Sequence, residues 1–374
     1  MSGHLWLERR LFSVARSSVR IEEETVRGYK ANDYYPVQTG QTFNGQYRTV
    51  GKPGYGSAST VWLCRDLQNQ AGHVVLKVYI NNSEQHREPS VCRHISNVSS
   101  EHPGREHVRK LLDSFEIEGP HGKHICLGYE PLGNSLALDF LHTEAGIIHT
   151  DLQPNNIILG MHDNSILAEF ERGEQQDPSP RKETDDRAIY VSRPMPLAKG
   201  WPSLSDFSEA RFGNVEHTDL VMPDVYRAPE VILGMSWSFP IDIWAFAMVL
   251  WDLFEPERLF SAKNENARYS EAHHLAQMIA VLGPPSQDFL RRSSKCEKYW
   301  DEHGRWIGDV PVPDTGLIRM EKMLSSKDKA DFLDFMKKVL QWRPEDRSDC
   351  NDIFFSEWPV ADLIESGQIV REEA

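Results

Sequence analysis

Cysteine is scarce in this sequence, and no two cysteines have the spacing of a metal-binding pair. The chain has 374 residues and only five Cys, none of them in a C-x-x-C pair. Structural zinc sites and disulfide frameworks both depend on paired, regularly spaced cysteines, so neither is expected here. The scattered, odd-numbered cysteines instead favour a reducing compartment.

Long hydrophobic runs and an excess of positive charge are also absent. No apolar stretch approaches the ~18 residues that a membrane-spanning helix needs. Lys and Arg number 41 against 56 Asp and Glu, which gives a formal net charge of −15. Binding to nucleic acid depends on clustered Lys and Arg, whereas an acidic surface attracts basic peptides. We therefore expect no membrane partner and no direct nucleic-acid partner.

Residues 1–46 are interpreted as an N-terminal extension, in which an arginine-containing stretch is followed by an acidic run. Residues 5–20, LWLERRLFSVARSSVR, mix apolar residues with arginines, as mitochondrial presequences do. The acidic run EEE at 22–24 ends this pattern abruptly. Two alternatives stay open: a mitochondrial targeting segment, or an extension that packs on the domain or stays mobile.

Residues 47–132 have the pattern of a small β-sheet with one helix. Short runs rich in β-branched and aromatic residues are separated by glycine-containing turns, which is typical of antiparallel strands. The predicted order is two strands in 47–67, a third over 73–80, a helix over 88–99, and strands over 108–119 and 124–132.

Residues 133–362 have a helical texture. The segment 241–254 is apolar nearly all round, which predicts a buried helix. Segments 270–283 and 328–342 repeat apolar residues at i, i+3, i+4 and i+7, the pattern of amphipathic helices. Residues 171–202 have no period and are rich in Pro and charge, so we predict a surface insertion there. Residues 363–374 are interpreted as a C-terminal tail.

A glycine-rich turn lies between the first two predicted strands. Residues 54–61 nearly match G-x-G-x-x-G-x-V, with Gly54, Gly56 and Val61 in place and Ser59 at the third glycine. Glycine lets a backbone approach phosphate groups without a Cβ in the way. This turn is therefore a candidate phosphate-binding loop.

A lysine stands in the middle of the third predicted strand. Lys77 lies within the apolar run VVLKVYI, and a buried lysine is costly unless it is paired with an acid. Glu88, on the predicted helix that follows, is the natural partner, and Glu84 is the rival.

Two aspartates follow in short loop-like motifs. HTDLQPNN, residues 149–156, places Asp151 and Asn156 five positions apart, directly before an apolar IIL run. Further along, Asp206 stands in LSDFSEAR. Carboxylate and amide oxygens at such positions suit metal binding and proton transfer.

Three more motifs occur towards the C-terminus. Glu230 belongs to the A-P-E triplet in VYRAPEVILG, and Asp242 opens the buried helix IDIW. A charged residue there needs backbone N–H donors. Arg347, in QWRPEDR, resembles the arginine that protein kinases pair with the A-P-E glutamate, which makes it the candidate buried partner of Glu230, and a pair of this kind is costly to break.

Taken in order, these motifs resemble those of protein kinases. The resemblance implies an α+β class, bilobal protein-kinase fold. Its N-lobe, residues 47–132, would be a five-stranded antiparallel sheet plus one helix, and its C-lobe, residues 133–362, would be mainly helical. It also implies roles: Asp151 as the base, the Lys77–Glu88 pair positioning phosphates, and Asn156 with Asp206 holding Mg²⁺.

The sequence is similar in particular to the SR-protein kinase family, fungal members above all. Thr150 replaces the Arg of H-R-D, and the stretches STVWL, HVRKLLDSFEIEGPHGKHICL and HHLAQMIAVLGPP carry the likeness. The family implies ATP, Mg²⁺ and serines of basic Arg/Ser-rich proteins as substrate, in a monomer of the cytoplasm and nucleus. It also implies Tyr129 as gatekeeper, with adenine meeting the backbone of Glu130 and Leu132.

Three features depart from the family pattern. Gln153 replaces a lysine that would stand near the transferring phosphate, and Ser208 replaces the Gly of D-F-G. Only ALDFLHTEAGIIH, residues 137–149, stands where kinases have two helices, so we expect a C-lobe lacking part of its usual helices. We also expect the apolar faces of the 241–254 helix to be exposed in consequence. A truncated gene model or splice form is one cause, and a residual fold with altered packing is the alternative.

Three functions stay open at this point. An active serine/threonine kinase is favoured by the four groups that handle phosphates, metal and proton. A pseudokinase acting as an interaction module is favoured by Gln153, Ser208 and the missing helices. A small-molecule phosphotransferase of similar architecture is disfavoured by the A-P-E segment, the IDIW helix and the late arginine.

Overall fold

The computed structural model describes residues 19–69, 72–81, 87–129, 137–159, 165–184, 186–195 and 202–354. The chain divides into two compact units, which we call the first unit (Met1–Ala137 with Ile158–Ser205) and the second unit (Leu138–Ile157 with Asp206–Ala374). Within the described ranges, no helix has both the length and the apolar character needed to cross a membrane.

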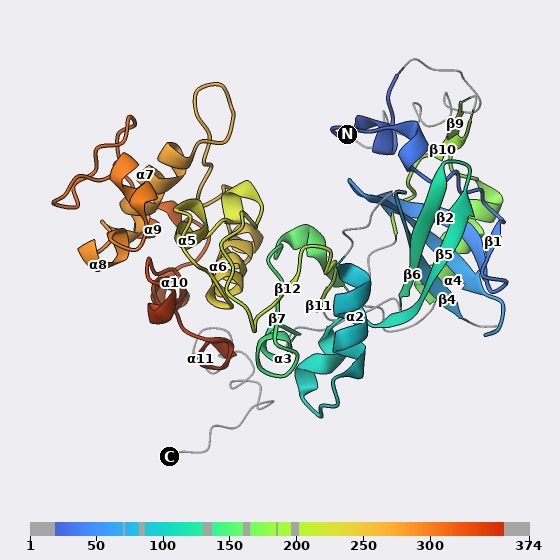
Figure 1. Ribbon diagram of the computed structural model, residues 1–374, viewed down its shortest axis with the longest axis horizontal. Coiled ribbons are helices and arrows are strands. Elements are labelled where there is room, and N and C mark those ends of the chain that lie inside the picture. Colours follow the sequence, from blue (N-terminus) through green and yellow to red (C-terminus); the bar gives the residue numbers. More distant parts are fainter. Residues whose placement is uncertain are drawn as a thin grey trace. The chain divides into compact units, whose positions relative to one another are not determined.

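The first unit contains a six-stranded antiparallel sheet with the strand order β1-β2-β3-β4-β6-β5 (Figure 1). The five predicted strands are present, and a two-residue edge strand adds a sixth. The strands are β1 Thr42–Phe43, β2 Tyr47–Tyr55, β3 Ser59–Asp66, β4 His73–Tyr79, β5 Leu111–Gly119 and β6 Gly122–Tyr129.

The centre of this sheet is buried because β3 and β4 are rich in apolar and β-branched residues. Trp62 and Cys64 of β3 pack with Val74, Leu76 and Val78 of β4 in one hydrophobic cluster. Strands of this composition, covered on their faces, are typical of a sheet interior. The single predicted helix forms as α2, Glu88–Asn97. Short 3-10 helices also occur in this unit: η1 Glu22–Thr25, η2 Ala31–Asp33 and η3 Pro103–His107.

The predicted surface insertion is folded onto the first unit, so the expectation of a solvated, irregular loop is wrong for much of it. Helix α4 (Ser165–Gln176) packs on β2, where a Cβ added at Gly51 would lie 2.7 Å from Glu174 and 2.9 Å from Phe170. The strands β9 (Arg181–Glu183) and β10 (Ala188–Tyr190) then pair as an antiparallel hairpin.

Charge explains why a segment rich in polar residues folds here. Glu171 of α4 accepts hydrogen bonds from Arg65 at 2.9 Å and from His73 at 3.1 Å, both on the sheet. Burial acts to raise the pKa of Glu171, but its hydrogen bonds from these two residues outweigh it and hold the pKa below its usual value. Periodicity could not show this, because the ion pairs join segments about 100 positions apart.

The second unit is mainly helical, as predicted (Figure 1). Its longest helix, α6 (Pro240–Phe254), is the predicted buried helix, and α7 (Glu271–Leu282) begins after the capping side chain of Ser270. The other helices are α3 Ala137–Thr143, α5 Pro229–Ile232, α8 Gln287–Leu290, α9 Leu317–Met320, α10 Ser326–Val339 and α11 Cys350–Phe354, with 3-10 turns η4 Pro154–Asn156, η5 Asp224–Tyr226, η6 Ser294–Lys298 and η7 Pro344–Asp346.

Helix α6 is not exposed over most of its length, contrary to the expectation from the short segment before His149. Nine of its residues are buried, including Trp244 and Trp251, and exposure is confined to its C-terminal end at Leu253 and Phe254. The seven-residue α3 contributes fully buried Phe140 and Leu141 to the same unit. Other side chains of the unit therefore cover α6.

Within the second unit, a buried ion pair joins Glu230 of α5 to Arg347, which directly follows η7. Arg347 donates to both carboxylate oxygens of Glu230 at 2.7 Å, and their side chains are 0% and 1% exposed. The guanidinium also donates to the carbonyls of Pro240 and Gln341, each at 3.0 Å. All three guanidinium nitrogens of Arg347 thus donate hydrogen bonds, which is the condition for a buried pair to be tolerated.

We predict that Arg347→Ala lowers the free energy of unfolding by about 3–5 kcal/mol, because Glu230 is left as an unpaired buried charge. Urea denaturation followed by tryptophan fluorescence measures the change. The matched control is Arg291→Ala, whose pair with Asp288 is 70% and 76% exposed, and it should cost less than about 1 kcal/mol. Equal midpoints for the two variants would contradict the prediction.

Candidate active site

The predicted catalytic loop, His149–Asn156, lies between two short strands. Strand β7 (Ile147–Ile148) precedes it and pairs with β12 (Arg211–Phe212), and β8 (Ile157–Leu159) follows it. Strand β8 pairs in turn with β11, Pro202–Leu204. Backbone pairing therefore fixes both ends of the loop, and this limits the positions that its side chains can take.

Asp242 holds the start of this loop from the N-terminus of α6. Its fully buried carboxylate accepts hydrogen bonds from the backbone N–H of His149 at 2.6 Å and of Thr150 at 2.8 Å. His142 of α3 lies 2.9 Å from the same carboxylate. A buried carboxylate is stable only with donors of this kind, and here two of the donors are the loop's own backbone.

Thr150 adopts a strained conformation that its surroundings support. Its φ is +65°, in the left-handed region that non-glycine residues rarely occupy. Its hydroxyl donates to the carbonyl of Glu209 at 2.6 Å, next to the D-F-S motif. The ring of Phe207 packs against that of His149 with centroids 5.2 Å apart. The loop and the D-F-S segment are thus held together by both polar and apolar contacts.

The carboxylate of Asp151 receives two side-chain hydrogen bonds. Asn156 Nδ2 donates to one oxygen at 2.7 Å and to the Asp151 carbonyl at 2.8 Å, and Gln153 Nε2 donates to the other oxygen at 3.0 Å. Burial raises the pKa of Asp151, and the charge of Asp206 adds to this effect. His149, Asn156 and Gln153 oppose it. The net result is a carboxyl group with a raised pKa, as suits a base that must accept a proton.

Asp206 lies in the same unit and has a left-handed backbone conformation, which Ser208, at the place of the D-F-G glycine, does not have. The φ of Asp206 is +65°, whereas Ser208 is not among the residues with positive φ. The serine therefore costs no left-handed strain. Its backbone N–H donates to Asp206 Oδ1 at 3.4 Å.

Asn156 and Asp206 supply oxygen atoms of the type that Mg²⁺ prefers. Among the described residues, no group of three or more His, Cys, Asp or Glu side chains is arranged to hold a metal by itself.

In the first unit, Lys77 and Glu88 form the predicted pair. Lys77 Nζ lies 2.8 Å from Glu88 Oε2, and both side chains are buried. The rival acid, Glu84, lies outside the described residues. Tyr129, at the end of β6, donates to the other oxygen of Glu88 at 2.6 Å. Sequence reasoning placed Tyr129 as gatekeeper but missed this bond, which depends on the register of β6.

The glycine-rich turn joins β2 to β3 in a tight hairpin. Gly54 is paired with Val61, and the N–H of Gly56 donates to the carbonyl of Ser59 at 2.8 Å. A Cβ at Gly54 would meet no other atom within 4 Å, so packing of the protein does not account for glycine there. The predicted hinge residues Glu130 and Leu132 lie outside the described residues.

The structure thus gathers the predicted site residues into two groups. The first unit holds the glycine-rich turn with Lys77 and Glu88. The second holds Asp151 hydrogen-bonded to Asn156, and Asp206, whose charge acts on Asp151. The reactive roles of these residues remain predictions.

Comparison with known proteins agrees with this arrangement. The family model described as "Protein kinase domain" matches residues 132–359. A solved structure of a kinase domain superposes with a TM-score of 0.66 at 22% sequence identity, covering 87% of this chain and 98% of that one. The kinase fold predicted from the sequence is confirmed.

Curated relatives narrow the family. A serine/threonine protein kinase of Aspergillus fumigatus is 42% identical over 94% of this chain and 93% of its own length. The serine/threonine-protein kinase SRPK of Physarum polycephalum is 31% identical over 88% of this chain and 90% of its own. SRSF protein kinase 3 of Mus musculus is 34% identical over 42% of this chain and 34% of its own.

The chain therefore belongs to the protein kinases, and within them to the SR-protein-kinase-like family. It is a protein serine/threonine kinase, and kinases of this class use ATP together with a divalent metal ion.

We predict that Asp242→Ala loosens the catalytic loop, because the N–H groups of His149 and Thr150 lose their acceptor in a buried place. The free energy of unfolding should fall by about 2–5 kcal/mol. Hydrogen exchange measured by mass spectrometry should show faster exchange in peptides covering 147–152. Asp328→Ala, at an exposed position in α10, is the control and should leave that exchange unchanged. Unchanged exchange in both variants would contradict the bracing role.

Proposed function

We propose that this kinase transfers the γ-phosphate of ATP to serine in basic, Arg/Ser-rich proteins. The observation that carries the catalytic part is the arrangement around Asp151, whose carboxylate is fixed by Asn156 and Gln153 on a braced loop. The substrate class is supported by the printed names of relatives, SRPK and SRSF protein kinase 3.

Asp151 accepts the proton of the attacking serine hydroxyl. As that proton leaves, the serine oxygen forms a bond to the γ-phosphorus, and the bond from this phosphorus to the bridging oxygen of ADP breaks. The raised pKa of Asp151 makes the carboxylate a better proton acceptor than an exposed aspartate. Its two hydrogen bonds orient the accepting oxygen towards one position.

Lys77 binds the α- and β-phosphates, and Glu88 keeps its ammonium group in place. Glu88 is itself held from two sides, by Lys77 at 2.8 Å and by Tyr129 at 2.6 Å. The backbone of the turn at Gly54 and Gly56 approaches the phosphates, for which the absence of a Cβ is required.

Asn156 and Asp206 are the residues that would hold Mg²⁺. The ion would neutralise charge on the phosphates during transfer. Asn156 Nδ2 is already used towards Asp151, so its side-chain amide is oriented by that contact.

Gln153 partly replaces the usual lysine. Its hydrogen bond to Asp151 keeps a donor beside the reacting groups, but it adds no positive charge. Loss of one transition-state stabiliser typically lowers the rate ~10²–10³-fold. We therefore propose catalysis that is slower than in a lysine-containing relative rather than absent, which disfavours the pseudokinase alternative.

A recess next to the catalytic loop carries two acids and one arginine, an excess of negative charge that suits basic substrates. A depression of about 310 Å³ is lined by Gln153 and Pro154 of the loop, and its charged lining residues are Asp252 and Glu255 at the end of α6 and Arg258 beyond it. Asp252 is fixed there by a hydrogen bond from Tyr226 at 2.6 Å. Together with the formal net charge of −15, this favours peptides that carry arginine near the target serine.

We predict that the wild-type chain transfers radiolabelled phosphate from Mg-ATP to an Arg/Ser-repeat peptide. Asp151→Ala removes the base and should lower kcat by ~10²–10⁴-fold. The matched peptide in which alanine replaces every serine should take up no label. Equal signal from wild type and the alanine variant would contradict the catalytic role of Asp151, and transfer only to a peptide lacking arginine would contradict the substrate class.

A second prediction concerns Gln153 and pH. Catalysis requires ionised Asp151, so activity is present above its pKa and is lost as the pH falls through it. Burial raises this pKa, which places the acid limb of kcat/KM above the range of an ordinary aspartate. Gln153→Leu removes a hydrogen bond to the ionised form and should move the limb to higher pH.

Gln153→Lys introduces a cation and should move the acid limb to lower pH while raising kcat, by up to ~10²-fold. Steady-state rates between pH 4.5 and 8 provide the measurement. Gln287→Leu, at an exposed position in α8, is the control and should behave as wild type. A limb that stays in place in both Gln153 variants would show that this side chain does not act on Asp151.

A further inference from the structure

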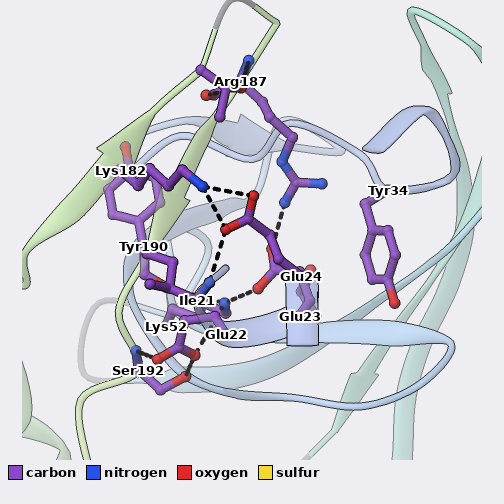
Figure 2. Close-up of polar contacts among 12 residues, drawn as sticks. Ile21, Glu22, Glu23, Glu24, Tyr34, Lys52, Lys182, Arg187, Tyr190 and Ser192 are labelled. Carbon is purple, nitrogen blue, oxygen red and sulfur yellow. Dashed lines mark hydrogen bonds and ion pairs between the residues drawn. The ribbon is translucent and has the colours of Figure 1, made fainter. Parts of the chain in front are cut away.

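A cluster of buried cations lies in the first unit (Figure 2). Lys52 comes from β2, Lys182 from β9, and Arg187 directly precedes β10. These residues are only 1%, 8% and 9% exposed. Buried Lys and Arg are strongly destabilising without anionic partners, so three of them in one place require an acidic ligand.

The ligand in this structure is the chain's own acidic run, Glu22, Glu23 and Glu24 (Figure 2). Lys182 Nζ donates to both oxygens of Glu24 at 2.9 Å. Glu23, 1% exposed, is bound by Lys52 and by Arg187 together. Three consecutive carboxylates therefore contact three cations: Glu22 contacts Lys52, Glu23 contacts Lys52 and Arg187, and Glu24 contacts Lys182.

Neutral groups around the cations also recognise this run. Glu22 accepts hydrogen bonds from the backbone N–H of Ser192 at 3.0 Å and from its hydroxyl at 2.6 Å. Lys182 Nζ donates in addition to the carbonyl of Val19 at 2.9 Å, which fixes the backbone that leads into the run. Contacts to carboxylates and to the main chain at once are typical of peptide recognition.

The bound segment has little structure of its own. Glu22–Thr25 forms a four-residue 3-10 helix, η1, which a chain in water does not maintain by itself. The residues that bind it lie 29 to 170 positions away in the sequence. Inside the segment, the Ile21 N–H donates to Glu24 at 2.9 Å and the Thr25 hydroxyl donates to the Glu22 carbonyl at 2.7 Å. The other contacts of its three carboxylates come from distant residues, so the segment behaves as a covalently attached ligand.

Arg187 retains donor capacity that the glutamates do not use. Its Nε and Nη1 atoms are buried and have no hydrogen-bond partner among the described residues. The guanidinium carbon lies 5.6 Å from the centre of the Tyr34 ring, which supports its position without accepting hydrogen bonds. The cations thus offer more hydrogen-bond donors than the three glutamates use, as expected of an anion-binding site.

We propose that Lys52, Lys182, Arg187 and Ser192 form a socket for an acidic peptide, and that its ligand is the chain's own Glu22–Glu24 segment. Binding of this segment joins β2 to the β9–β10 hairpin, because Lys52 lies on the former and Lys182 with Arg187 on or beside the latter. Lys52 stands two residues before Gly54, and its carbonyl accepts from Arg193 N–H at 2.9 Å. The segment thus acts as a latch on the strand that leads into the glycine-rich turn.

The first test is a double-mutant cycle in the full-length chain with Glu24→Gln, Lys182→Gln and the double variant. Each single change leaves a buried charge unpaired and should increase hydrogen exchange of peptides covering 21–26 and 181–192 at least ~10-fold. The double variant should be no worse than either single variant, because the two residues act as a unit. Additive effects would overturn the assignment, as would unchanged exchange in the single variants.

The second test supplies the ligand from outside. A fluorescent peptide of residues 19–28, VRIEEETVRG, should bind the full-length chain carrying Glu22→Gln, Glu23→Gln and Glu24→Gln at least ~10-fold more tightly than it binds wild type, whose socket is occupied. The same peptide with three glutamines should not bind, and Lys182→Gln added to the triple variant should abolish binding. Equal binding to wild type and the triple variant, or of both peptides, would overturn the proposal.

The control variant is Glu302→Gln, whose side chain is 87% exposed and which should match wild type in both tests. If the triple variant does not fold, the double-mutant cycle still decides the proposal, because each of its steps removes one charge only. Neither readout requires phosphate transfer, so a failure of the proposed catalysis would leave this inference standing, and the reverse also holds.

Discussion

The arrangement of the active site depends above all on the buried carboxylate of Asp242. It accepts the backbone N–H groups of His149 and Thr150 and lies 2.9 Å from His142, so one residue joins α6, α3 and the catalytic loop. From there, the hydroxyl of Thr150 reaches the carbonyl of Glu209, and the D-F-S segment is positioned in turn. Because a charged group at 0% exposure tolerates no loss of donors, this geometry is strongly specified.

The same physical principle recurs through the molecule: buried acids are fixed by several donors each. Glu88 is bound by Lys77 and Tyr129, and Glu230 is bound by both arms of Arg347. Glu23 in the acidic run is bound by Lys52 and Arg187. Lys77 and Glu88 are 11 positions apart, and the other contacts join residues 29 to 164 positions apart. In each unit, the positions of these acidic side chains therefore depend on the tertiary structure and not on a local motif alone.

The departures from the family pattern have different weights once the structure is considered. Ser208 carries no left-handed strain, since Asp206 and Thr150 have the positive φ angles. Gln153 donates to Asp151 and so stays in contact with the proposed base. The short segment before His149 leaves α6 largely buried. The physical reason is that side chains from elsewhere in the second unit cover α6, which periodicity within one segment cannot reveal.

The sequence by itself determined the kinase fold, the strands and helices with strong periodicity, and the pairings of Lys77 with Glu88 and of Glu230 with Arg347. The strands and helices follow from local apolar patterns, whereas the fold and the two pairings follow from the resemblance of the ordered motifs to those of protein kinases. Only the tertiary structure decided that residues 165–193 fold onto the sheet and that Glu22–Glu24 binds Lys52, Lys182 and Arg187. Both of these arrangements depend on charges that come together from distant segments. The sequence alone does not show whether a charged side chain is solvated by water or paired with another side chain.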